Sequence, residues 1–99
     1  ATLFIALKQD FPEQFPIFSR EVTRVGDRSV VNSGRRLIKN IPGVRGAKFG
    51  YTRAAGFNGA VYVKRGSNEV VAVIFGGRST ATMIRQMQLI VDEGFTTFN

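Results

Sequence analysis

The chain has 99 residues, 43% hydrophobic and 21% charged, which excludes a disordered segment and fits one small globular domain or part of one. It contains no cysteine and no histidine, which excludes disulfides, thiol nucleophiles, Ser–His–Asp triads and zinc sites built on these ligands. We therefore expect no metal and no cofactor, and no apolar run approaches the roughly 20 residues of a membrane-spanning helix.

The net charge of +7, from 14 basic and 7 acidic side chains, allows two interpretations. It favours polyanionic partners such as nucleic acid, anionic lipid or an acidic wall polymer. The simpler interpretation is a solvated surface, because no basic run reaches the about 5–8 residues of a polybasic patch. A small nucleic-acid-binding module is therefore a remote alternative.

The N-terminal segment 1–9 has the pattern of the last turns of a helix, with three apolar side chains on one face: Leu3, Phe4 and Leu7. No capping residue precedes it, so we expect this segment to be the end of a helix whose beginning is missing. Residues 10–17 form a loop marked by two prolines. We expect some of its aromatic rings to pack beneath the loop rather than to stack on nucleic-acid bases: Phe11, Phe15 and Phe18.

A hairpin is predicted over residues 18–31, with Val22 and Val25 in the first arm and a Gly-Asp turn. A short helical turn over residues 35–39 follows, with Asn32 or Ser33 as its cap. Its apolar side chains should face inward: Leu37, Ile38 and Ile41. A Pro-Gly pair then breaks the chain.

Three strands are predicted next, over residues 47–52, 58–65 and 69–75. In the second strand, Val61 and Val63 lie on one face, and Tyr62 and Lys64 lie on the other. The third strand, EVVAVIF, is apolar on both faces after its glutamate, so we expect it to be covered on both sides.

A final helix is predicted from Ser79 or Thr80, either of which can cap it, to about Glu93, with Gly94 just beyond its C-cap. Its core stripe has a spacing of three to four residues: Met83, Ile84, Met87, Ile90 and Val91. The fold class is therefore α+β, or a fragment of an α/β sandwich. We expect an antiparallel sheet, made of the three strands and the preceding hairpin, with the C-terminal helix packed on it.

The stretch AKFGYTRAAGFN, from Ala47 to Asn58, is the most informative part of the sequence, and it includes a lysine two residues before a glycine on a strand. Three further segments accompany it: DFPEQFPIFS from residue 10, VAVIFGGRS ending at residue 79, and MQLIVDEGF from residue 87. With these segments the chain resembles the serine D-alanyl-D-alanine carboxypeptidases, which are the low-molecular-mass penicillin-binding proteins. The resemblance covers almost the whole chain, and GYTRAAGFN is its most specific part.

The resemblance implies that residues 1–99 form the C-terminal part of a transpeptidase domain, whose K-T-G strand faces the active-site cleft. In that family the lysine adds positive charge, the threonine hydroxyl helps to hold the substrate carboxylate, and the N–H after the glycine forms half of the oxyanion hole. By position, the resemblance implies catalytic roles for Lys48 and the backbone of Tyr51. The substrate-binding candidates are the residues around them: Phe49, Gly50, Thr52 and Arg53.

Two departures from the family pattern bear on activity. The threonine position is occupied by Phe49, which has no hydroxyl and whose ring could fill the space of the substrate. The chain also lacks Ser-x-x-Lys and Ser-x-Asn, the motifs that supply the nucleophile and its partners. Simpler interpretations also stay open: a core position for Phe49, a surface lysine at position 48 and a solvated Arg53.

The resemblance implies a protein that cleaves the terminal D-Ala of a peptidoglycan stem peptide through an acyl-serine, and that also binds β-lactams. We expect this chain alone to be inactive, and a non-catalytic descendant that binds peptidoglycan or a partner protein is the alternative. In the family the sheet has five strands, so this chain should expose an apolar face or cover it with the rest of the domain or with another copy. The family implies a periplasmic or secreted location, although the chain contains no signal peptide.

Overall fold

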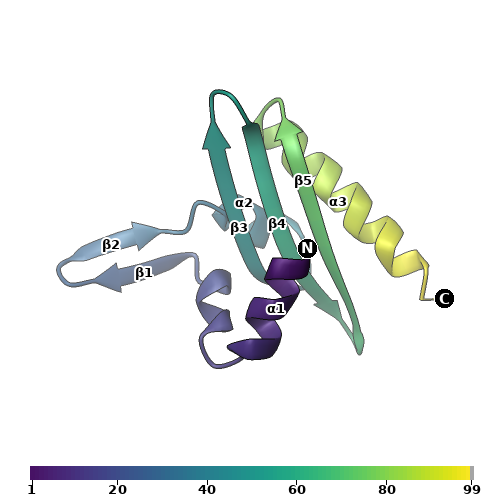
Figure 1. Cartoon of the computed structure of the whole chain (residues 1–99), viewed down its shortest axis with the longest axis horizontal. Coiled ribbons are helices and arrows are strands. Elements are labelled where there is room, and N and C mark those ends of the chain that lie inside the picture. The colour runs from purple at the N-terminus through teal and green to yellow at the C-terminus, as the bar shows by residue number, and fades with distance from the viewer. Residues whose placement is uncertain (99) are drawn as a thin grey trace.

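The chain has an α+β fold, in which helices and antiparallel strands follow one another along the sequence. The computed structural model describes residues 1–98 (Figure 1). The elements follow one another as α1 (Thr2–Asp10), the 3-10 helix η1 (Phe15–Ser19), β1 (Val22–Val25), β2 (Arg28–Val31), α2 (Arg35–Asn40), β3 (Val44–Thr52), β4 (Gly56–Arg65), β5 (Asn68–Gly77) and α3 (Thr80–Thr96). This order confirms the predicted α+β fold class. None of the helices within residues 1–98 combines the length and the hydropathy that a membrane span needs.

The central sheet has the strand order β3–β4–β5, and each strand runs antiparallel to the next. The register places Lys48 opposite Ala60, and Ala60 opposite Val73. Helix α3 packs along one face of the sheet, and α1 and η1 lie against part of the other (Figure 1). We refer to these as the α3 face and the α1 face.

The main core lies between the α3 face of the sheet and helices α2 and α3. It is formed by buried residues of these elements: Leu37, Ile41, Ala47, Val61, Val63, Ala72, Ile74, Met83, Ile84, Met87 and Val91. The predicted alternation of Val61 and Val63 against Tyr62 is therefore confirmed. The prediction that Ile90 belongs to the buried stripe of the helix is wrong, because Ile90 is 43% exposed on the outer side of α3.

A smaller aromatic core lies on the α1 face. Phe4, Phe15 and Tyr62 are buried there, and the rings of Phe15 and Tyr62 meet edge to face with centroids 5.7 Å apart. The predicted packing of aromatic rings beneath the loop is confirmed for Phe15, whereas Phe11 is 55% exposed. Gly46 makes room for this core, since a Cβ atom at that position would lie 2.9 Å from the Phe15 ring.

The predicted hairpin forms but does not join the central sheet. Strands β1 and β2 make a separate two-stranded sheet that extends away from the body of the molecule (Figure 1). Its four valines are each at least half exposed: Val22, Val25, Val30 and Val31. The expectation of a single sheet that includes the hairpin is therefore wrong, because in the described part of the chain β1 and β2 pair only with each other.

Helix α3 begins where the sequence predicts, at a Ser79 cap whose Oγ accepts a hydrogen bond from the Thr82 N–H at 3.1 Å. The predicted end at Glu93 is wrong, because the helix continues through Gly94 to Thr96. The longer helix is explained by its tertiary contact with β5. A Cβ atom at Gly94 would lie 3.2 Å from a methyl of Val70, so the glycine lets the last turns of α3 approach β5.

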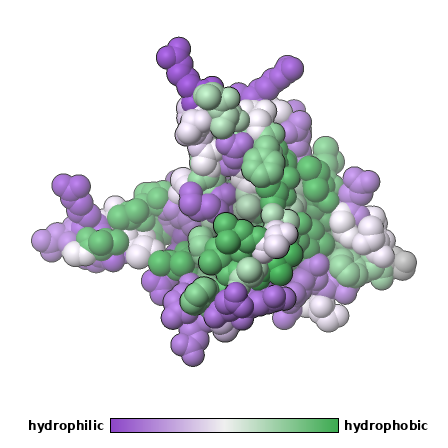
Figure 2. Space-filling model, in the orientation of Figure 1, coloured by the Kyte–Doolittle hydropathy of each residue, from purple (hydrophilic) through white to green (hydrophobic). Residues whose placement is uncertain are grey.

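The α1 face of β5 is covered only at its first half. Val71 packs against the aromatic core, but Phe75 is 82% exposed, so the prediction of cover on both sides is wrong for the end of this strand. Figure 2 shows hydrophobic atoms over the upper part of the sheet, beyond the end of α1. The expected exposed apolar face is therefore present.

Candidate functional site

Within residues 1–98, strand β3 is an edge strand, which pairs with β4 on one side and with no strand on the other. Lys48 projects from its α1 face, and its Nζ donates a hydrogen bond to the Phe49 carbonyl oxygen at 2.6 Å. The Ser33 hydroxyl, in the segment before α2, donates to the same oxygen at 3.3 Å. The Phe49 carbonyl therefore points away from β4, to the open edge of the sheet.

The direction of that carbonyl also fixes the direction of the Tyr51 N–H. In an antiparallel edge strand, alternate residues direct both their N–H and C=O groups outward. Tyr51 follows Phe49 by two residues in the same regular register, so its N–H faces the open edge as well. Its ring lies on the α3 face and contacts Phe57, with centroids 4.4 Å apart. The backbone of Tyr51 can therefore offer a donor to a ligand that lies along the edge.

The ring of Phe49 lies on the opposite face of the sheet from Lys48. It is half-buried, packs against the main core and has its centroid 6.0 Å from that of Phe57. Of the two interpretations left open by the sequence, the structure agrees with the core position. The ring fills no space beside Lys48, so the substitution removes a hydroxyl without blocking the α1 face.

A shallow hollow of about 180 Å³ lies on the α1 face at this point of the sheet. Its lining combines backbone, one cation, one amide and an apolar wall: Lys48, Phe49, Gly50, Asn58, Gly59, Ala60, Val73 and Phe75. A Cβ atom at Gly50 would meet no atom within 4 Å, and its φ is not in the left-handed region. Packing therefore does not require a glycine here, whereas close approach of a ligand to the backbone would.

Asn58 is a residue of this site that sequence reasoning did not assign. It sits where the β4–β5 register shifts, its Oδ1 accepts from the Gly76 N–H at 2.9 Å, and its Nδ2 donates to the Gly56 carbonyl at 3.1 Å. These bonds hold the β3–β4 turn, where Gly56 has a φ of +75°, against the end of β5. The signal was present as the last residue of GYTRAAGFN, without a role attached to it.

Three candidate residues do not line the hollow: Tyr51, described above, Thr52 and Arg53. The Thr52 hydroxyl accepts a hydrogen bond from the Ala55 N–H at 3.0 Å and so belongs to the β3–β4 turn. Arg53 is exposed in that turn. The structure thus brings Lys48, Phe49 and Gly50 together at the hollow, and places Tyr51, Thr52 and Arg53 outside its lining.

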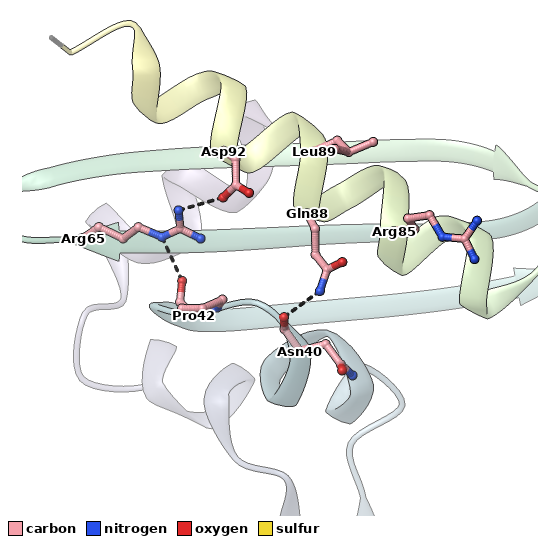
Figure 3. Close-up of a pocket in the computed structure, with 7 residues that line it drawn as sticks. All are labelled: Asn40, Pro42, Arg65, Arg85, Gln88, Leu89 and Asp92. Atoms are coloured by element: carbon pink, nitrogen blue, oxygen red, sulfur yellow. Dashed lines mark hydrogen bonds and ion pairs between the residues drawn. The ribbon is translucent and has the colours of Figure 1, made fainter.

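Another hollow, of about 530 Å³, lies elsewhere, between α3 and the segment after α2 (Figure 3). Its polar groups bind one another: Arg65 donates to Asp92 at 2.8 Å and to the Pro42 carbonyl at 3.0 Å, and Gln88 donates to the Asn40 carbonyl at 2.7 Å. These contacts fasten α3 to the turn before β3. We assign them a structural role.

Neither hollow offers a metal site. Within residues 1–98, no group of three or more acidic side chains lies close enough together to hold a metal ion. The chemistry of the edge of β3 is instead that of a cation, outward backbone donors and a glycine. Such an arrangement suits a ligand with a carboxylate or a developing oxyanion.

Solved structures have the same arrangement of elements. A D-alanyl-D-alanine carboxypeptidase from Mycobacterium tuberculosis superposes with a TM-score of 0.76 at 24% sequence identity, and the match covers 93% of this chain. The chain shares the fold of that protein. A penicillin-binding protein homologue from the same organism gives a TM-score of 0.78, also at 24% identity and with 93% of this chain covered.

The fold likeness spans 37% of the length of each of these two proteins. No protein-family model matches the sequence, and a search of curated proteins gives no match. The resemblance stated from sequence motifs is therefore confirmed at the level of the fold.

Proposed function

We propose that this chain forms the K-x-G side of a carboxypeptidase-like cleft, which binds the D-Ala-D-Ala end of a peptidoglycan stem peptide or a β-lactam. The residues involved are Lys48, which attracts the carboxylate, Gly50, which lets the ligand lie close, and Tyr51, whose N–H donates to the acyl oxygen. In the complete protein this ligand would react through an acyl-serine. Residues 1–99 would be the C-terminal part of that protein's catalytic domain.

The observation that carries the proposal is the open edge of β3. Four consecutive residues of this strand include an exposed lysine, a glycine that packing does not require, and an outward N–H. The chain to which the strand belongs has the fold of a carboxypeptidase. A surface lysine alone would explain the first of these features and leave the other two without a reason. The sequence motif GYTRAAGFN supports the same assignment.

The proposed cleft has only one side in this chain. The apolar wall beside it, made of the partly buried Val73 and of Phe75, which is 82% exposed, would contact the remaining part of the domain or, in its absence, a second copy of the chain. A periplasmic or secreted location belongs to the same proposal, because peptidoglycan lies outside the cytoplasmic membrane.

A labelled penicillin tests the proposal in two steps. With the 99-residue chain, we expect no covalent adduct in the intact mass spectrum, because no Ser-x-x-Lys motif is present. We expect reversible binding of acetyl-D-Ala-D-Ala instead, seen as shifts of the backbone amides of Lys48, Gly50 and Tyr51 in NMR spectra. A stoichiometric adduct contradicts the inactive state of the chain, and unshifted amides contradict the binding edge.

A second candidate function, a non-catalytic peptidoglycan-binding descendant, is supported by Phe49. Its ring is part of the core, so the hydroxyl that would hold a carboxylate is absent and the neighbouring packing is adapted to an aromatic residue. Phe49→Thr in the complete parent protein distinguishes the two. A true non-catalytic protein stays inactive, whereas recovered hydrolysis of a D-Ala-D-Ala peptide identifies an impaired enzyme.

A further inference from the structure

Strand β5 forms a second edge of the central sheet, on the side opposite β3 (Figure 1). Within residues 1–98 it pairs only with β4. The Lys64 N–H donates to the Gly43 carbonyl at 2.9 Å, away from β5, so the backbone of Glu69, opposite Lys64 in the register, likewise points away from β4. Alternate residues repeat this direction, so Val71 and Val73 also turn their N–H and C=O groups to the open edge.

The two edges of the sheet differ in how they are protected. On β3, the side chains of Lys48 and Ser33 donate to the outward carbonyl of Phe49. Strand β5 is ten residues long, and residues 70–77 include no charged side chain. Short edge strands and edge lysines are the usual protection against the pairing of sheet edges. The long, uncharged edge of β5 is therefore suited to receive another strand.

The α1 face of β5 has a projecting ring at one end and a hollow at the other. Phe75, near the end of the strand, is 82% exposed. A hollow of about 260 Å³ lies between α1 and the beginning of β5, and its lining includes Ile5, Lys8, Tyr62, Glu69 and Val71. It lies on the β5 side of α1, because the hollow on the other side of the Lys8–Glu69 pair is lined by residues of η1 and β3 instead.

A two-fold axis at the open edge would bring the ring and the hollow together. When two copies of β5 pair antiparallel with Val71 opposite Val73, Phe75 of each copy comes opposite Glu69 of the other. Opposite side chains lie on the same face of a sheet, with their Cβ atoms about 4.5–5.5 Å apart. The Phe75 ring then lies beside the wall of the hollow that Glu69 and Val71 form. The contact occurs twice, because a two-fold interface is the same on both copies.

On the α3 face the same edge is flanked by Ile90. The side chains of Gln88 and Asp92 bind the end of α2 and the end of β4, so they mark the flank of α3 that is turned toward β3. Ile90 is two residues from each, about 200° around the helix, so it lies on the opposite flank, beside β5. Its side chain is 43% exposed, and the two-fold axis would bring it toward Ile90 of the second copy.

We propose that the open edge of β5 is the interface of a homodimer, in which two copies form one continuous antiparallel sheet and each inserts Phe75 into the hollow between α1 and β5 of the other. A second copy fits better than an unrelated strand, because the ring and the hollow that receives it belong to the same strand. The net charge of +7 does not oppose the contact, since the edge is uncharged and Lys8 pairs with Glu69 at 3.2 Å.

The dimer goes beyond the proposed function and does not depend on it. The two β3 strands lie at the far ends of the joined sheet, so the edge that contains Lys48 and Gly50 stays open in each copy. Peptide binding at one edge and dimerisation at the other can therefore be measured separately.

Sedimentation velocity of the 99-residue chain tests the interface. With rising concentration the chain should change from monomer to dimer and form nothing larger, because a two-fold contact closes on itself. Val73→Lys places a charge at the edge and should raise the dimer dissociation constant at least about tenfold. Val73→Thr, at the same position but uncharged, is the matched control and should dimerise as the unmodified chain does.

A second pair of variants tests the hollow. Ile5→Ser, in its lining, should weaken the dimer about tenfold, because the Phe75 ring loses apolar cover in both halves of the interface. Leu3→Ser, on the same helix and 72% exposed but outside the lining, should leave the dimer unchanged. Dispersed amide spectra of each variant verify that the fold is retained.

The register has its own test, because the chain contains no cysteine. In an oxidised equimolar mixture of Val71→Cys and Val73→Cys, the mixed disulfide should be the main cross-link. Opposite residues lie within the about 4.4–6.8 Å between Cα atoms that a disulfide spans, whereas two copies of the same position lie diagonally and too far apart.

Each other outcome overturns the dimer as described. A monomer at every concentration means that the β5 edge does not bind a second copy, and growth beyond the dimer means that the edges pair in an open array. Equal association of Val73→Lys and Val73→Thr removes the edge from the interface, and equal losses for Ile5→Ser and Leu3→Ser remove the hollow. Unshifted Lys48 and Gly50 amides with acetyl-D-Ala-D-Ala would contradict the proposed function and support the independence of the dimer if it persists.

Discussion

The Nζ of Lys48 lies 2.6 Å from the carbonyl oxygen of Phe49, so the lysine covers the open edge of the strand to which it belongs. The Ser33 hydroxyl donates to the same oxygen, which satisfies this carbonyl while no ligand is bound. An ammonium has three donors, so Lys48 can keep this contact and still receive a carboxylate on the α1 face. The same side chain would thus protect the edge and attract the ligand.

Lys48→Ala should weaken the binding of acetyl-D-Ala-D-Ala about tenfold, the lower end of the range for a hydrogen bond to a charged group, because the site is exposed. An NMR titration measures this change. Lys64→Ala, in β4 and also exposed, is the matched control and should bind normally. Equal affinities of the two variants would remove Lys48 from the binding site.

Gly46→Ala should destabilise the fold by about 1–3 kcal/mol, because the new methyl would lie 2.9 Å from the Phe15 ring in a packed core. Gly50→Ala, in the same strand, meets no atom within 4 Å and should leave the free energy of unfolding almost unchanged. Urea unfolding of both variants measures the difference.

The second variant also has a functional readout. A methyl at position 50 would project into the hollow that we assign to the peptide, so binding of acetyl-D-Ala-D-Ala should decrease although the fold is intact. If Gly50→Ala binds the peptide as well as the unmodified chain does, the ligand does not lie over this residue.

Glu69 of β5 holds α1 in place through Lys8, whose Nζ lies 3.2 Å from both carboxylate oxygens. Hydrogen bonds from Tyr62 and then from Lys8 lower the pKa of Glu69 below its ordinary value of 4.5. A carboxyl with a lowered pKa adds stability above its unfolded-state pKa and loses it as the pH falls through the folded-state value. Glu69→Gln should therefore destabilise the chain at about pH 7 but no longer at about pH 3.

Urea unfolding at the two pH values measures this linkage. The unmodified chain should lose stability relative to Glu69→Gln as the solution is acidified. A difference between the two proteins that is the same at both pH values would mean that Glu69 contributes through its shape and not through its charge.

Phe75→Ser should reduce self-association of the chain, because Phe75 is 82% exposed on the apolar wall of the proposed cleft. Sedimentation velocity over a range of concentrations measures this. Leu89→Ser, on the outer side of α3 and 66% exposed, removes a comparable apolar side chain elsewhere and is the control. If both variants associate as the unmodified chain does, the wall is not a contact surface.

Local patterns in the sequence predicted much of this fold. The alternation of Val61, Tyr62 and Val63 correctly predicted which side chains lie on each face of β4, because successive side chains of a strand point to opposite faces. The cap of α3 was predicted at Ser79 or Thr80, and it lies at Ser79, because a capping hydroxyl accepts from an N–H only three residues away. The edge strand, by contrast, was expected from its context and from the family resemblance, which rests mainly on GYTRAAGFN.

The errors, the alternatives left open and the residues that were missed concern features that depend on distant parts of the chain. A glycine such as Gly94 is typical of a helix end, but here it lies inside α3, where it lets the helix pack closely against Val70. Whether Phe49 faced the cleft or the core depended on Phe57 and α3, which a single strand pattern does not specify. The separation of the hairpin from the sheet, and the role of Asn58 at a register shift, likewise follow from strand pairing rather than from residue type.

The order of the central sheet has a consequence for how the chain acquires its structure. Each of its pairings joins strands that are consecutive in the sequence, linked by residues 53–55 or 66–67. Short loops close at little entropic cost, so this sheet can assemble early and quickly. The contact between Lys8 and Glu69 spans 61 residues, and we infer that α1 docks only after the sheet exists.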